Sequence, residues 1–199
     1  MTYAHDETIE KATVLFWKKG FQGAGMRDIQ EALDMRPGSI YARFQSKEGL
    51  FKLVVEHYVQ QSQAALQEVA ESPEPIKALR AFFMASLMCQ DDQRFMRQCL
   101  LVRSVTELEL LGSMAKKAVI DGMGMLRESF ENIVKHAVVL NALPYDTPIS
   151  RSADWLQNQF VGLRTYAMLQ SDDKCIEEMI EKVLFDLSRQ WSTPHHAFT

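Results

Sequence analysis

The sequence predicts an all-α protein of about nine helices. Apolar residues recur at helical spacing along nearly the whole chain, and runs of alternating β-branched residues are missing. The six prolines fall between the periodic segments or in their first turn, where a missing N–H breaks no hydrogen bond. A chain of 199 residues with 47% hydrophobic content is also long enough to bury a sizeable core.

The first two helices are predicted over residues 6–19 and 26–33. In the first, Ile9 and Phe16 lie on one face at helical spacing, and Gly20 follows as a residue suited to end a helix. In the second, the apolar residues likewise fall on one side. Two amphipathic helices therefore open the chain.

The next two helices are predicted from their start signals. Proline is favourable at a first helical position, so a third helix begins at Pro37, with Ile40 and Phe44 facing inward. Ser46 caps a fourth, longer helix, because its side-chain oxygen can accept a first-turn N–H. This helix runs to about residue 70 and stops before the sequence SPEP.

Five further helices complete the prediction. Asp-Asp, Ser-Asp and proline-containing stretches separate them, because these residues favour turns. No internal repeat or low-complexity tract interrupts the pattern. The predicted ranges are 74–89, 92–107, 110–141, 151–170 and 173–191.

The composition restricts the function classes. The net charge is −4 and the pI about 5.8, so any binding to nucleic acid must come from a local basic patch. The three cysteines form no C-x-x-C pair and no leader segment opens the chain, which favours a reducing cytoplasm. The longest apolar run is far shorter than the ~20 residues that span a bilayer, so we expect no membrane partner.

The stretch MRPGSIYARFQSKEGLF, residues 35–51, carries the clearest functional signal. Two short helices that meet at a tight turn have the layout of a helix-turn-helix, whose second helix enters the DNA major groove. Gly38 has no Cβ, so the backbone there can approach a phosphate or a base edge. An ordinary solvated helix face is the alternative interpretation. The exposed face is predicted to carry Arg36, Ser39, Tyr41 and Arg43.

Four short motifs in residues 9–58 follow one known pattern. They are Leu15-Phe16 with Gly20-Phe21, Arg27-Asp28-Ile29, Gly38-Ser39-Ile40-Tyr41 with Phe44, and Ser46-Lys47-Glu48 with Leu50. In order and spacing they resemble the N-terminal DNA-binding domain of the tetracycline-repressor (TetR) family of transcriptional regulators. The resemblance implies a helix-turn-helix DNA-binding domain over residues 1–46, followed by a ligand-binding and dimerisation domain over residues 47–199.

Three positions depart from the family pattern, and one of them, Arg36, replaces the usual small cap of the recognition helix. Gly25 stands where Ser or Thr usually caps the second helix, and Asp34 holds a turn position often occupied by Gly. Asp tolerates a left-handed conformation better than most residues, so we expect the turn to form. The resemblance implies phosphate contacts from Arg27, Tyr41 and Lys47, and base contacts from Arg36, Ser39 and Arg43.

The last two predicted helices carry apolar stripes at alternating spacings of four and three. Such stripes suit a four-helix dimer interface, and a role in the core of one chain is the alternative. Because a single recognition helix binds DNA well only as a symmetric pair, a homodimer is favoured. The predicted interface residues are Leu156, Phe160, Leu163, Ala167, Ile176, Ile180, Val183 and Leu187.

Eleven Met and eleven Phe are many for a chain of this length. They would suit a deformable cavity for a small apolar or aromatic effector, although ordinary core packing explains each of them equally well. Cys99 is either a reactive sensor, with Arg103 on its helical face favouring the thiolate, or inert packing. The candidate lining residues are Met84, Met88, Phe95, Met96, Cys99, Phe130 and Tyr166.

The resemblance to the TetR family therefore implies a ligand-responsive, sequence-specific DNA-binding regulator. A repressor is expected, released from a palindromic operator by its effector. The alternative is an all-α small-molecule binding protein or enzyme with an incidental basic turn. No catalytic or cofactor site is expected, and His195-His196 lack a third ligand for a metal. The expected partners are double-stranded DNA, a second copy of the chain and the effector.

Overall fold

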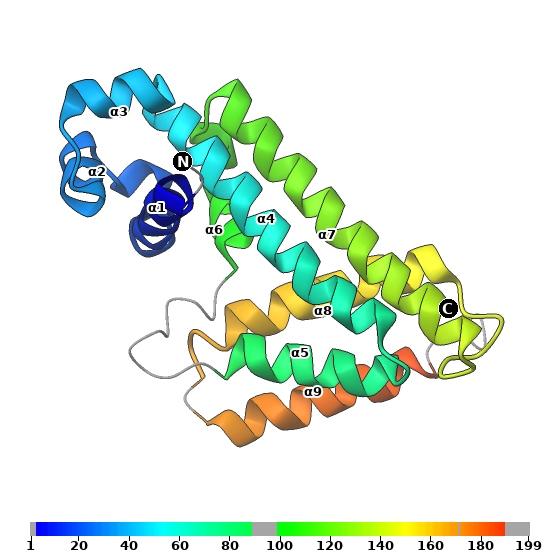
Figure 1. Ribbon diagram of the computed structural model, residues 1–199. Helices are drawn as coiled ribbons and strands as arrows, with labels where there is room; N and C mark the ends of the chain where they lie inside the picture. The colour runs from blue at the N-terminus through cyan, green and yellow to red at the C-terminus, as the bar shows by residue number, and fades with distance from the viewer. Residues whose placement is uncertain (1–2, 89–98, 171, 190–199) are drawn as a thin grey trace. The chain divides into compact units, whose positions relative to one another are not determined.

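The computed structural model describes residues 3–88, 99–170 and 172–189 (Figure 1). Within these ranges the chain forms nine α-helices, one short 3-10 helix and no strand. The prediction of an all-α fold is confirmed. The elements are α1 (Tyr3–Gly23), α2 (Met26–Leu33), α3 (Pro37–Phe44), α4 (Lys47–Glu71), α5 (Pro75–Leu87), α6 (Leu100–Thr106), η2 (Leu108–Leu110), α7 (Ser113–Val139), α8 (Ile149–Tyr166) and α9 (Asp173–Leu187).

Local start and stop signals agree with the observed helix ends. α3 begins at Pro37, and α4 follows Ser46, whose Oγ accepts the N–H of Gly49 at 3.0 Å. Gly20 has φ 73° and ψ 174°, so the regular part of α1 ends there, although the helix is assigned as far as Gly23. Signals that depend on one or two neighbouring residues were therefore sufficient to place these ends.

Several predicted helix ends differ from the structure by a few residues, and two predicted ranges differ in how they begin. The helix predicted over 92–107 is not continuous, because Cys99 is extended (φ −64°, ψ 133°) and α6 begins after it. Residues 92–98 of that range lie outside the described residues. The helix predicted over 110–141 begins later, at Ser113, because the 3-10 helix η2 comes first.

The described residues form two compact units. The first unit contains residues 3–62 and 99–125, and the second contains residues 63–88, 126–170 and 172–189. Helices α4 and α7 contribute residues to both. The predicted boundary between residues 46 and 47 stays a prediction.

An aromatic cluster holds the first unit together. The buried rings of Phe16 and Phe51 meet edge to face with centroids 5.1 Å apart, and Phe21 lies 5.0 Å from Phe51. Ile29 of α2 and Ile40 of α3 are fully buried in the same unit. Burial of this apolar surface supplies the main stabilisation of α2 and α3, which are too short to be stable alone.

A second aromatic cluster forms the core of the second unit. The ring centroids of Phe83 and Phe160 lie 4.7 Å apart, and that of Phe130 lies 5.7 Å from Phe160. At the surface of this unit Arg80 of α5 pairs with Glu177 of α9 at 2.8 Å. Among the described residues no helix is both long and apolar enough to cross a membrane.

Candidate nucleic-acid interface

The turn between α2 and α3 is closed by a C-terminal cap at Asp34. Asp34 adopts the left-handed conformation, with φ 50° and ψ 46°. The N–H of Met35 donates to the carbonyl of Gln30 at 3.1 Å, and the N–H of Asp34 donates to that of Glu31 at 3.4 Å. These two bonds form a Schellman motif, which normally favours Gly at the left-handed position. The expectation that Asp supports this turn is confirmed.

The start of α2 is capped from within the helix. Gly25 has no side chain to cap it, but its N–H donates to Asp28 Oδ2 at 2.8 Å. Lys19 of α1 holds the other carboxylate oxygen at 2.6 Å. The Lys19 hydrogen bond, and after it the Gly25 N–H, lower the pKa of the Asp28 carboxyl below its usual range. One carboxylate thus caps α2 and ties it to α1.

Helix α3 presents a continuous exposed face of polar residues. Ile40 and Phe44 are buried at 0% and 3% exposure and anchor the opposite side. Tyr41 is 51% exposed, and Arg27 on α2 is also exposed. The remaining predicted DNA-binding residues of α3 and its N-cap are all exposed, namely Arg36, Gly38, Ser39 and Arg43.

Gly38 is not required by the packing of the protein itself. A Cβ built at this position has no heavy atom within 4 Å, and its φ is not positive. By contrast, a Cβ at Gly49 would overlap the carbonyl oxygen of Phe44. No contact among the described residues therefore requires glycine at position 38.

Lys47 is held in place at the start of α4. Its Nζ lies 4.4 Å from the centroid of the Phe21 ring, a distance typical of a cation–π contact. Burial lowers the pKa of Lys47, while the charges of Glu107 and Asp28 oppose this effect. The ammonium group is thus positioned by α1 rather than extended freely into solvent.

Glu48 is the only acid in residues 35–51, and it is engaged elsewhere. Its Oε1 accepts the N–H of Ala115, in the first turn of α7, at 2.9 Å. Sequence reasoning missed this role, because the two residues are 67 positions apart. The charge of the exposed stretch on α3 is consequently set by Arg36 and Arg43.

The described residues predicted to line an effector cavity are distributed over both units. Met84 and Met88 are half-buried in the second unit, Phe130 is 1% exposed there, and Tyr166 is 41% exposed. Cys99 belongs to the first unit, is 5% exposed, and accepts a hydrogen bond from the Tyr58 hydroxyl at 3.3 Å. The effector role of these residues stays a prediction. The other two predicted lining residues, Phe95 and Met96, lie outside the described residues.

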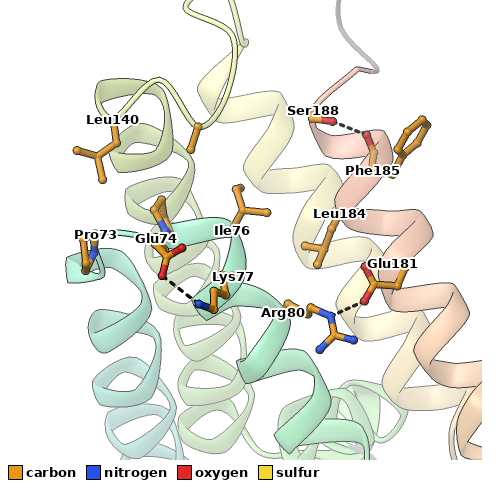
Figure 2. Close-up of a pocket in the computed structure, with 12 residues that line it drawn as sticks. Pro73, Glu74, Ile76, Lys77, Arg80, Leu140, Glu181, Leu184, Phe185 and Ser188 are labelled. Carbon is orange, nitrogen blue, oxygen red and sulfur yellow. Dashed lines mark hydrogen bonds and ion pairs between the residues drawn. The ribbon is translucent and has the colours of Figure 1, made fainter.

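A groove of about 640 Å³ lies in the second unit (Figure 2). Its walls come from the start of α5, the segment after α7 and the end of α9. Ile76, Leu140, Leu184 and Phe185 supply apolar surface, and the Arg80–Glu181 ion pair lies beside them. None of the five predicted effector residues that the structure describes is among its walls. Helical periodicity gave no sign of this groove, because three separate segments build it.

The residues predicted for a dimer interface face the interior of their own chain. All of them are between 0% and 8% exposed: Leu156, Phe160, Leu163, Ala167, Ile176, Ile180, Val183 and Leu187. Helix α9 also exposes Met179 and Phe185, at 38% and 51%. Only exposed side chains offer surface to a second chain, and Met179 and Phe185 are the exposed large apolar side chains of α9. The interface assignment itself stays a prediction.

The described residues contain no group of three or more His, Cys, Asp or Glu side chains arranged to hold a metal ion. The predicted pair His195-His196 lies outside the described residues.

The sequence is similar to known transcriptional regulators. Residues 9–54 match the family model described as bacterial regulatory proteins, tetR family. The HTH-type transcriptional repressor ComR of Escherichia coli (strain K12) is 29% identical over 108 residues, which are 53% of this chain and 51% of ComR. The chain thus spans about half the length of this curated relative.

Two solved structures have the same fold. A TetR family transcriptional regulator from Agrobacterium tumefaciens superposes with a TM-score of 0.81 at 19% identity, covering 94% of this chain and 98% of that one. The TetR family transcriptional regulator CifR, in a cysteine mutant complexed with 26 bp double-strand operator DNA, superposes with a TM-score of 0.73 at 26% identity. That superposition covers 90% of this chain and 95% of CifR.

Proposed function

We propose that this chain, which belongs to the tetR family of bacterial regulatory proteins, represses transcription by binding a specific DNA operator through α2 and α3. The observation that carries the proposal is the exposed face of α3. This face presents Arg36, Ser39 and Arg43 while Ile40 and Phe44 hold the helix in the core. A short helix fixed from behind, with cations and a hydroxyl in front, suits the major groove.

We assign two kinds of DNA contact. The exposed side chains of Arg36, Ser39 and Arg43 would read base edges, where the fork of an Arg fits guanine O6 and N7. Lys47 and Tyr41 would hold phosphates, together with Arg27 on α2. The ring of Phe21 beneath Lys47 supports this assignment, because a pre-positioned ammonium loses less freedom on binding.

We propose that the chain acts as a homodimer. Two copies on a palindromic site place their recognition helices about one helical turn apart, roughly 34–36 Å. The 26 bp operator bound to CifR is long enough for two such half-sites. The exposed apolar side chains of Tyr166, Met179 and Phe185 support an interface on α8 and α9, next to the buried stripes.

We propose a small apolar or aromatic molecule as the effector. The groove bounded by Ile76, Leu140 and Phe185 is one place for it, since its volume and mainly apolar walls are typical of small-molecule sites. The groove begins two residues after the end of α4, the helix that starts at Lys47. A ligand there would contact the segment directly after α4, and α4 begins at the proposed phosphate contact Lys47.

Selection of bound sequences from random duplex DNA tests the proposal. The purified chain should enrich one palindromic sequence, and its affinity for that sequence should fall steeply with salt. Recovery of no common sequence, with equal affinity for selected and random duplexes, would overturn the proposed function.

A further inference from the structure

We propose that Glu48 is a positioning residue for DNA binding, which fastens the first turn of α4 to the first turn of α7 and so fixes Lys47 for its phosphate. This inference rests on the proposed function. It adds a residue that the family resemblance did not assign to DNA binding. Glu48 would act through Lys47 and not by touching DNA itself.

The carboxylate of Glu48 occupies a favourable site at a helix N-terminus. Its Oε1 accepts the N–H of Ala115 at 2.9 Å, and α7 begins only two residues earlier, at Ser113. Amides in a first helical turn have no partner within their own helix, and the helix dipole favours a negative charge there. The contact therefore joins α4 to α7 by a charge-assisted hydrogen bond within the first unit.

Gly112 leaves the space that the Glu48 carboxylate occupies in this contact. A Cβ at Gly112 would lie 2.6 Å from the carboxyl carbon of Glu48, closer than real Cβ atoms approach. A larger residue there would require the end of the Glu48 side chain to shift. The position before α7 thus leaves space that the carboxylate fills.

A second carboxylate fastens the neighbouring end of α1 in the same way. Glu107 Oε2 accepts the N–H of Gln22 at 3.0 Å, and the Gln22 side-chain amide donates to the carbonyl of Leu110 at 2.8 Å. A Cβ at Gly20 would overlap the Glu107 carboxylate. Phe21, whose ring contacts Lys47, lies between Gly20 and Gln22. The segment from α6 to α7 therefore holds both the end of α1 that carries Phe21 and the start of α4 that carries Lys47.

Because Glu48 is negatively charged, the direction in which DNA affinity changes when its carboxylate is removed tests the inference. A carboxylate next to a phosphate-binding lysine normally weakens DNA binding, so removing it should strengthen binding. If Glu48 instead positions Lys47, removing the carboxylate should weaken binding, although the protein becomes less negative. The two explanations predict opposite changes in affinity.

The experiment measures affinity for one duplex over a range of salt concentrations, with folded fractions checked by circular dichroism. Glu48→Ala removes the contact, Glu48→Gln keeps an acceptor for the Ala115 N–H, and Glu48→Asp keeps the charge on a shorter side chain. Glu31→Gln is the matched control, because it removes one negative charge from an exposed site on α2. Lys47→Met, alone and combined with Glu48→Ala, completes a double-mutant cycle.

We expect Glu48→Ala and Glu48→Asp to weaken DNA binding and to flatten its salt dependence. Glu48→Gln should retain most of the wild-type affinity and most of the wild-type salt slope. One phosphate contact contributes a slope of about 0.9 in log affinity against log salt, which is about eightfold in affinity for tenfold less salt. The losses for Glu48→Ala and Lys47→Met should not add, since both remove the same contact. Exchange of the Ala115 amide hydrogen should be faster in Glu48→Ala and unchanged in Glu31→Gln.

Equal or tighter binding by Glu48→Ala, with an unchanged salt slope, would overturn the inference while leaving the proposed function intact. If Glu48→Ala does not fold, the comparison of Glu48→Gln with Glu48→Asp tests the inference. Equal DNA affinities for these two variants would also overturn it. Failure of the wild-type chain to bind any duplex would instead overturn the proposed function, and this inference with it.

Discussion

Replacing Gly38 by alanine should stabilise the protein and weaken its binding to DNA. Gly38 is the second residue of α3, with no heavy atom within 4 Å of a built Cβ and no positive φ. Alanine is favoured over glycine in a helix by about 0.5–1 kcal/mol. For a chain of this size, ~1 kcal/mol raises Tm by about 2–4 °C. We therefore expect Tm to rise by about 1–4 °C.

The loss of DNA affinity follows from the position of the added methyl group. On the exposed side of α3 it would separate the backbone from DNA and break a close polar contact. A hydrogen bond to a charged group contributes about 1.5–3 kcal/mol, which is about a tenfold to hundredfold change in affinity. Stability and affinity should thus change in opposite directions, which a simple folding defect does not produce.

Thermal unfolding followed by circular dichroism and fluorescence anisotropy with a labelled operator measure the two quantities. Gly124→Ala is the matched control, because Gly124 lies on α7 and a Cβ there also has nothing within 4 Å. It should raise Tm by a similar amount and leave DNA affinity unchanged. Wild-type DNA affinity in Gly38→Ala would refute the idea that the backbone at the start of α3 approaches DNA closely.

Three other substitutions test separate parts of the account. Arg43→Ala should relax base preference at one position of each half-site by about 1–3 kcal/mol, whereas Lys47→Met should weaken all sequences alike; equal losses on operator and random DNA for Arg43→Ala would show a wrong assignment. Gln45→Gly should raise Tm by a few degrees in thermal unfolding, because Gln45 has φ 64° and non-glycine residues lose about 1–2 kcal/mol there; an unchanged or lower Tm would count against this strain. Phe185→Glu should dissociate the proposed dimer in sedimentation without unfolding the chain, because Phe185 is 51% exposed; a dimer of unchanged stability would place the interface elsewhere.

Features of the fold that depend on neighbouring residues could be predicted from the sequence. Pro37 and Ser46 mark helix starts through their own backbone and side-chain chemistry, and Asp34 supports its turn in the same way. The contact between Glu48 and Ala115 joins residues 67 positions apart, and no periodicity connects them. Local rules therefore locate the helix-turn-helix but not what holds it against α7.

The apolar stripes show the limit of periodicity most clearly. The spacing of Leu156, Phe160, Ile176 and Ile180 correctly indicates which face of each helix is apolar. It does not say whether that face packs inside one chain or against a second one. Similarly, the helical face shared by Cys99 and Arg103 could not reveal that Cys99 is extended and accepts the Tyr58 hydroxyl.

The affinity ratio between the selected operator and a scrambled duplex of the same composition tests the central claim most directly. Both duplexes should be measured at the same salt concentration, near 0.15 M, because non-specific binding depends strongly on salt. The account predicts that the operator binds at least about a thousandfold more tightly, and that a change in either half-site removes most of the difference. A ratio near one would contradict sequence-specific recognition by α3.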